Sequence, residues 1–173
     1  MPHKFLLKEF EDFSRSARDA KALMQHVSQR IHMEVLRYNL ISFYLIDKND
    51  FTTLVLGPYA GSFTPAPRLS LNEGITGAAA SIGRVIVADN VAEDPRYVLT
   101  SDLVKSQISA PILVAGKPAG VFNVESYFLS AFKPAQEREF VEACAKIVGR
   151  SLESTRAVDP VNVQVSFGSS LPR

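Results

Sequence analysis

The residue types that most often carry catalysis or bind metals are few in this sequence and lie far apart. Cys144 is the single cysteine among 173 residues, and the three histidines stand at positions 3, 26 and 32. One thiol excludes an intrachain disulfide, and this spacing excludes a Cys/His zinc site and a redox Cys-x-x-Cys pair. Alanines flank Cys144 within a helical pattern, which favours a buried structural side chain over a reactive thiolate. The sequence therefore predicts neither a metal nor a cofactor.

A second set of polar side chains follows a strand-like alternation in the middle of the chain. Successive side chains of a strand point to opposite faces of its sheet. In the segment 40–46, the apolar Ile41 and Phe43 alternate with Ser42 and Tyr44. Two later segments repeat this alternation, so one face of the sheet is expected to carry Ser42, Tyr44, Gln107, Ser109, Asn123 and Glu125.

Two interpretations of this polar face stay open. One is a face that simply contacts water, as in many antiparallel sheets. The other is a small-molecule pocket, because two long loops, residues 57–67 and 89–106, flank the face in sequence order. In the second interpretation, Tyr97 and Thr100 of the longer loop close the pocket over its ligand.

The segment Gly74-Ile75-Thr76-Gly77 begins an alanine-rich helix that Gly83 ends. It is not a phosphate-binding P-loop, because no Gly-Lys-Ser/Thr follows it. Its glycines favour close packing of the helix on the sheet. The functional alternative is that Ile75 and Thr76, at the helix start, present free N–H groups to a ligand.

The elements that must position these residues combine helices with hairpins. Residues 5–36 carry apolar side chains at spacings of three and four, without Pro or Gly, and predict one long helix. Such a helix exceeds what one domain needs, so we expect a homodimer joined by a four-helix bundle. Strands are expected over 40–46, 51–56, 68–71, 84–88, 107–114 and 119–126, with a last helix from Pro134 to about Thr155.

This order of elements predicts an α+β domain with an antiparallel sheet and helices on one face. The chain divides into an N-terminal helix over residues 1–36, with a part in dimerisation, a ligand-binding domain over 37–155 and a flexible tail over 156–173.

Composition and charge limit the possible partners. The chain is 46% hydrophobic and 21% charged, with a net charge of +1, so it offers no basic field to nucleic acid. Its longest apolar run, Leu40–Ile46, is far shorter than the roughly 20 residues of a transmembrane helix. The N-terminus does not read as a signal peptide. We therefore expect a cytoplasmic protein that binds neither nucleic acid nor membrane.

Several segments, in their order and spacing, resemble the GAF domain superfamily over about residues 20–154. The resemblance is nearest to the branch of free methionine-R-sulfoxide reductases and a related nitrate-sensing GAF protein. It implies a six-stranded antiparallel sheet, helices on one face and a loop-covered ligand pocket on the other. The supporting segments are Ile41-Ser42-Phe43-Tyr44-Leu45, Leu56-Gly57-Pro58-Tyr59, Glu73-Gly74-Ile75-Thr76-Gly77, Asp94-Pro95-Arg96-Tyr97, Ser109-Ala110-Pro111-Ile112 and Gly120-Val121-Phe122-Asn123-Val124-Glu125-Ser126.

The sequence departs from the reductase branch where that branch uses cysteine, because Thr64-Pro65, Ile75 and Thr100 stand in those regions. Attack on a sulfoxide sulfur needs a thiolate, and release of the product needs a second thiol. We therefore expect that the chain is not an enzyme. Where the branch has three acidic pocket residues, this chain has Gln107, Asn123 and Glu125.

Together these patterns predict a GAF-type sensor or signalling module without catalysis. A small polar molecule or anion would bind between the sheet and the 89–106 loop, and a partner such as a regulator or sensor kinase would read the resulting shift. The alternatives are a divergent reductase-like enzyme and a ligand-free dimerisation scaffold. The expected ligand-binding residues are Ser42, Tyr44, Ile75, Thr76, Tyr97, Thr100, Gln107, Asn123 and Glu125.

Overall fold

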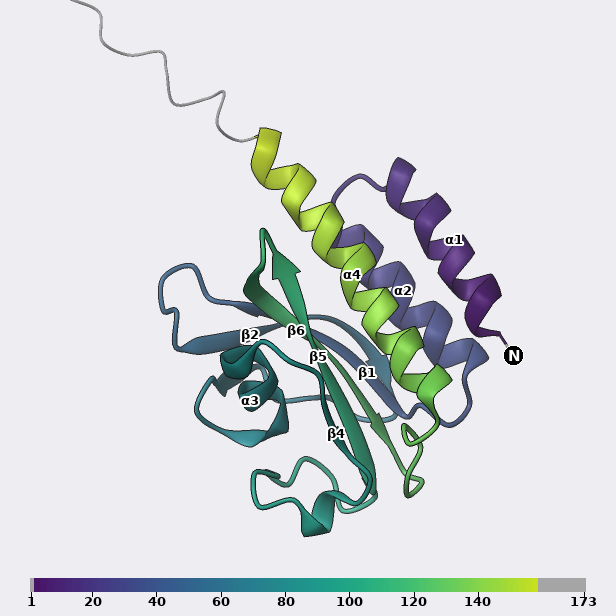
Figure 1. Ribbon diagram of the computed structural model, residues 1–173, viewed down its shortest axis with the longest axis vertical. Helices are drawn as coiled ribbons and strands as arrows, with labels where there is room; N and C mark the ends of the chain where they lie inside the picture. The colour runs from purple at the N-terminus through teal and green to yellow at the C-terminus, as the bar shows by residue number, and fades with distance from the viewer. Residues whose placement is uncertain (1, 159–173) are drawn as a thin grey trace, which may run out of the picture.

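A computed structural model describes residues 2–158 and shows one sheet with a helical layer on one face and a short helix with loops on the other (Figure 1). Helices α1 (His3–Ser16), α2 (Ala20–Glu34) and α4 (Ala135–Val158) form the layer, and α3 (Gly74–Ile82) lies on the opposite face. The expected α+β architecture, with terminal helices on one face, is confirmed.

The sheet contains six strands in the spatial order β3-β2-β1-β6-β5-β4, and each neighbouring pair is antiparallel. A short 3-10 helix, η1 (Val91–Glu93), lies in the connection between β4 and β5. The strands are β1 (Leu40–Ile46), β2 (Thr53–Gly61), β3 (Arg68–Ser70), β4 (Ile86–Ala88), β5 (Ser106–Val114) and β6 (Lys117–Ser126).

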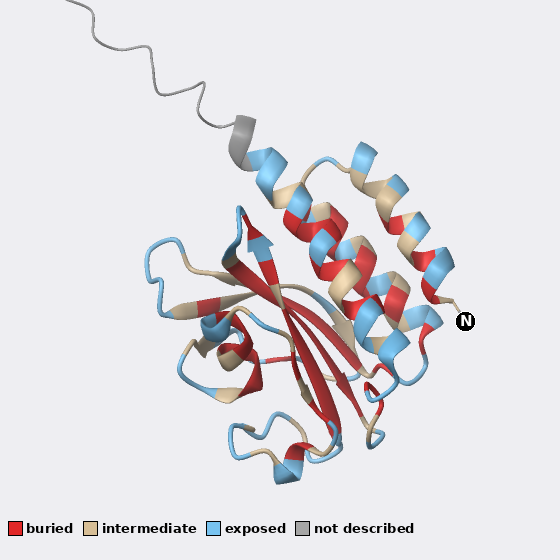
Figure 2. Cartoon of the chain, in the orientation of Figure 1, coloured by how far each residue is buried: buried red, intermediate tan, exposed pale blue. Residues whose placement is uncertain are grey.

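Strand alternation divides the interior into two apolar cores. Phe43 and Phe122, from β1 and β6, stack at a centroid distance of 4.5 Å in the core beneath the helical layer. Tyr44 and Val121, their sequence neighbours, point to the other face and pack in the core beneath α3. The central strands are therefore buried on both sides, as their red colour in Figure 2 shows.

The N-terminal segment corrects the prediction of one helix over residues 5–36, because it forms two helices. The backbone is extended at Ala17, and the Asp19 side chain accepts a hydrogen bond of 2.8 Å from the N–H of Ala22 at the start of α2. Aspartate is a preferred N-cap because its oxygen satisfies such a free N–H. The apolar spacing continues across this break and therefore conceals it.

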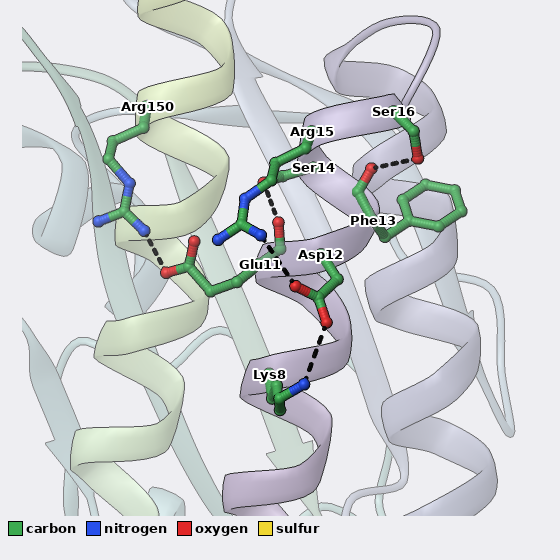
Figure 3. A network of polar contacts seen from close by, with 8 residues as sticks. All are labelled: Lys8, Glu11, Asp12, Phe13, Ser14, Arg15, Ser16 and Arg150. Atoms are coloured by element: carbon green, nitrogen blue, oxygen red, sulfur yellow. Dashed lines mark hydrogen bonds and ion pairs between the residues drawn. The ribbon is translucent and has the colours of Figure 1, made fainter.

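The two helices fold back on each other and bury the apolar stripe within one protomer. Glu9 of α1 contacts His26 of α2 at 2.8 Å and accepts a hydrogen bond of 2.9 Å from Arg30. On the other side of α1, Glu11 pairs with Arg150 of α4 (Figure 3). Most of the apolar stripe is buried within one protomer, including Leu6, Phe10, Met24, Val27 and Ile31. The homodimer stays a prediction.

Strand β2 continues through part of the expected 57–67 loop. The register against β1 shifts so that Gly57-Pro58 of β2 oppose the single residue Phe43. Proline cannot donate to a strand ladder and is tolerated at such a bulge. The Gly57-Pro58 pair therefore bends the strand and does not end it.

The C-terminal helix is longer than expected, because α4 reaches Val158 and takes in the first three residues of the predicted 156–173 tail. The rest of that tail, residues 159–173, lies outside the described residues. Within residues 2–158, no helix is both long and apolar enough to cross a membrane.

Replacing Asp19 with alanine is expected to lower the midpoint of unfolding in urea, because the N–H of Ala22 loses its acceptor. Asp19→Asn is the matched control, since it keeps a side-chain oxygen at the cap and should unfold close to the wild type. Equal midpoints for Asp19→Ala and the wild type would contradict the capping role.

Candidate functional site

A pocket of about 210 Å³ lies on the α3 face of the sheet. Side chains of β1, β5 and β6 form its floor, the start of α3 forms one wall, and two loop segments, 63–66 and 97–100, cover it. Eight of the nine predicted ligand-binding residues line it, namely Tyr44, Ile75, Thr76, Tyr97, Thr100, Gln107, Asn123 and Glu125.

Ser42 is the exception, and its prediction as a lining residue is corrected. Its side chain is fully buried beneath the floor, where its hydroxyl accepts a hydrogen bond of 3.4 Å from the amide nitrogen of Asn123. Strand alternation placed Ser42 on the correct face, but Ser42 is fully buried and is not among the residues that line the pocket.

A buried network of amides and hydroxyls forms the floor. The oxygen of Asn123 accepts hydrogen bonds of 2.8 Å from both Gln107 Nε2 and the hydroxyl of Ser109, and another from Thr76 at 3.3 Å. Gln107 Nε2 also donates to Thr76 at 3.1 Å. Its amide oxygen has no hydrogen-bond partner among residues 2–158, although Gln107 is only 4% exposed. This oxygen is therefore free to accept from a ligand.

Glu125 supplies the one carboxyl of the floor and is only 3% exposed. One oxygen accepts a hydrogen bond of 3.1 Å from Asn123, and the other accepts one of 2.9 Å from Thr100. Burial raises the pKa of Glu125, and these two hydrogen bonds oppose the rise. Within the described part of the chain, no basic side chain forms an ion pair with Glu125.

The loop over the pocket contains a turn of its own and makes one side-chain hydrogen bond with the sheet. Arg96 donates to Asp94 at 2.7 Å, which lowers the pKa of the Asp94 carboxyl. The hydroxyls of Tyr97 and Thr100 lie 3.4 Å apart, and Thr100 then reaches Glu125. The loop thus meets the sheet through a chain of polar groups.

The second covering segment was expected only as part of a flanking loop, and its individual residues were missed. The Tyr44 hydroxyl donates a hydrogen bond of 2.8 Å to the carbonyl of Ala66, which holds this segment over the pocket. Burial raises the pKa of Tyr44, so the phenol remains a donor. No local sequence pattern marks these positions. The lining residues that were missed are Phe63, Thr64, Pro65, Ala66, Leu69, Glu73, Gly74, Val98 and Leu99.

Cys144 lies far from this chemistry, in the core beneath the helical layer. Burial raises the pKa of its thiol, which keeps it protonated. No thiol lines the pocket.

Comparison with known proteins places these features in context. The GAF domain family matches residues 17–153, which includes α2 and the whole sheet. A free methionine-R-sulfoxide reductase of Saccharomyces cerevisiae is 26% identical over 134 residues, covering 77% of this chain and 72% of the yeast protein. Protein YtsP of Bacillus subtilis is 26% identical over 151 residues, covering 86% of this chain and 91% of that protein.

The fold has clear counterparts among solved structures. The free methionine-R-sulfoxide reductase of Neisseria meningitidis, in complex with its substrate, has a TM-score of 0.83 at 24% identity and covers 90% of this chain and 91% of that one. The expectation that this chain is not an enzyme is contradicted by these comparisons, because proteins named as enzymes are among its sequence relatives. That expectation rested only on the absence of cysteine at Thr64-Pro65, Ile75 and Thr100.

Glu125→Gln is expected to stabilise the protein at neutral pH. Below the pKa of the unfolded state, both states carry a protonated Glu125, and the substitution gains nothing from charge. As the pH rises towards the raised pKa of the folded state, the unfolded state releases its proton first and the wild type loses stability. The advantage of the variant, measured by urea unfolding across a pH series, should therefore grow as the pH rises above about 4.

Glu139→Gln is the matched control, since it removes an exposed carboxyl of α4. It should leave the pH dependence of unfolding unchanged. A Glu125→Gln variant that is less stable than the wild type throughout this range would show that the carboxylate is satisfied as it stands.

Proposed function

Since this chain belongs to the GAF domain family, we propose that it is a sensor or signalling module whose pocket binds a small polar molecule with a positively charged amino group. One observation carries the proposal: Glu125 is buried at the floor of the pocket without a cation among the described residues. A ligand ammonium supplies that cation and gains a charge-assisted hydrogen bond in return.

The balance of donors and acceptors supports a cation over an anion. The hydroxyls of Thr100 and Tyr44 already donate within the protein, to Glu125 and to the carbonyl of Ala66. The free side-chain group at the floor is the oxygen of Gln107, which is an acceptor. An anion such as nitrate would meet the Gln107 oxygen and the Glu125 carboxyl, which repel it. The N–H groups at the start of α3, which has no side-chain cap, are the donors that remain for an anion, and they share the pocket with that carboxyl.

The size of the pocket favours a compact ligand. A volume of about 210 Å³ is below the roughly 300–1,000 Å³ of pockets that hold drug-sized molecules. A free amino acid is of suitable size, and its α-ammonium is the charged donor that the floor lacks. The names of the reductase relatives make free methionine-R-sulfoxide the first ligand to test.

Sensing requires that the bound and free states differ at a surface that a partner can read. The hydrogen bond between Thr100 and Glu125 joins the ligand site to the covering loop, so a ligand at Glu125 changes what holds that loop. A regulator or sensor kinase is the class of partner that would read the change. The ligand biases this output only as far as its affinities for the two loop states differ.

The reductase relatives favour a second candidate function, reduction of the bound sulfoxide. The reaction breaks the S–O bond, releases the oxygen as water and consumes two electrons and two protons. Because no thiol lines the pocket, an external dithiol would supply them and leave as a disulfide. Methionine production in the presence of dithiothreitol that persists in Cys144→Ser would support this function.

Isothermal titration with free methionine-R-sulfoxide tests the proposed ligand class. We expect binding to the wild type, and Glu125→Gln should weaken it about tenfold to a hundredfold, because a charge-assisted hydrogen bond is lost. The N-acetyl derivative, which lacks the charged amine, should bind at least as weakly.

Glu139→Gln serves again as the control and should bind like the wild type, since Glu139 is exposed on α4. Nitrate is the opposing probe. Tight nitrate binding together with an unchanged affinity in Glu125→Gln would contradict a cation-selective pocket.

A further inference from the structure

The Thr100 hydroxyl donates to one oxygen of Glu125, the carboxyl that the proposed ligand ammonium would contact. We propose that Thr100 is an internal competitor, so that ligand capture at Glu125 displaces its hydroxyl and releases the loop segment 97–103. The inference rests on the proposed function for the identity of the displacing group. The competing contact itself is present in the structure, as a hydrogen bond of 2.9 Å from Thr100 Oγ1 to Glu125 Oε2.

Of the two Glu125 oxygens, Oε2 is the one for which Thr100 and a ligand would compete. Its partner Oε1 accepts from Asn123 Nδ2, and Asn123 is locked within the buried floor by its other hydrogen bonds. The contact to Thr100 is different, because Thr100 is exposed and belongs to a loop. A ligand that enters from the pocket therefore exchanges with Thr100 more easily than with Asn123.

The loop is fixed at both ends and weakly held between them. At its start, the N–H of Val91 donates 2.9 Å to the carbonyl of Lys105, and at its end, the N–H of Lys105 donates 2.8 Å to the carbonyl of Ser126. Between these anchors, Val98 and Leu99 are 52% and 68% exposed. In the described structure, the bond from Thr100 to Glu125 is the hydrogen bond that ties this middle part to the sheet.

The chemical difference between the two donors gives the exchange its direction. A hydroxyl makes a neutral donor to the carboxylate, whereas an ammonium makes a charge-assisted hydrogen bond of about twice the strength. The ammonium also supplies the positive charge that the buried carboxyl lacks. Every ligand must displace the Thr100 hydroxyl, and this displacement lowers the apparent affinity of all ligands by the same factor. A neutral ligand donor only replaces one neutral hydrogen bond with another, so it gains little free energy from binding at Glu125.

By linkage, a partner that holds the loop in its released form would raise the affinity for the ligand by the same factor. The same hydrogen bond thus limits ligand binding and transmits it to the surface. This gives the covering loop a regulatory role in addition to excluding water from the pocket.

Hydrogen–deuterium exchange of the full chain without ligand tests the contact directly. Thr100→Val keeps the shape of the side chain and removes the hydroxyl, so the backbone amides of residues 97–103 should exchange faster than in the wild type. Thr100→Ser is the matched control, because it keeps the hydroxyl and should exchange like the wild type. Equal exchange in all three proteins would overturn the claim that this hydrogen bond restrains the loop.

Titration with free methionine-R-sulfoxide then tests the competition. Thr100→Val should bind about fivefold more tightly than the wild type, because no internal donor has to be displaced, while Thr100→Ser stays within about twofold. Adding the ligand should speed exchange of residues 97–103 in the wild type and change it little in Thr100→Val. Weaker binding by Thr100→Val, or slower exchange on adding ligand, would overturn the proposal and make Thr100 a direct ligand contact.

The two sets of measurements separate the failure of this inference from the failure of the proposed function. If free methionine-R-sulfoxide binds none of the proteins, the proposed function and the role of the ligand as competitor are both wrong. The exchange measured without ligand would still decide whether Thr100 restrains the loop. If the ligand binds with the expected dependence on Glu125 and only the Thr100 variants disagree, the function stands and this inference fails.

Discussion

The pocket side of the domain depends on the amide of Asn123. Its oxygen accepts from β5 and α3, and its nitrogen donates to Ser42 of β1 and to Glu125 further along β6. Buried polar groups are costly unless they are paired, so these partners must stay together. The same pairing decides which atoms remain for a ligand: the Gln107 amide turns its nitrogen inward and leaves its oxygen free.

The sheet separates the larger apolar core, which lies beneath the helical layer, from the pocket on its other face. Beneath α1, α2 and α4 the core is almost wholly apolar and contains Cys144, whereas the other face combines a smaller apolar core with the polar floor. Strand alternation makes this division possible, because neighbours such as Phe43 and Tyr44 serve opposite faces.

Membership of the GAF domain family explains the architecture but leaves the chemistry of this pocket to its own residues. The relatives include enzymes, and this overturns an expectation that was drawn from missing cysteines alone. The floor nevertheless offers acceptors and one buried carboxyl, with no thiol in the lining. Those groups are the basis of the proposal that the pocket binds a charged amine.

The sequence by itself determined the alternation of faces, the antiparallel hairpins and most of the polar side chains that meet in the pocket. Such features follow from local rules: a period of two along each strand, and glycine where φ is positive, as at Gly83, which ends α3, and at Gly116, in the turn before β6. The family resemblance fixed the number of strands and the side on which the pocket lies. Local patterns did not reveal the break before Asp19, because an unbroken apolar spacing is compatible with one helix or with two that fold together.

Tertiary structure alone decided which polar atoms are used and which are free. Three hydrogen bonds show this: Asn123 donates to Ser42, Tyr44 donates to the carbonyl of Ala66, and Thr100 donates to Glu125. The partners in these three pairs are 81, 22 and 25 residues apart in the chain. No local propensity encodes such contacts, since they form only when the closed sheet brings distant segments within hydrogen-bonding distance and removes the water that would otherwise satisfy them.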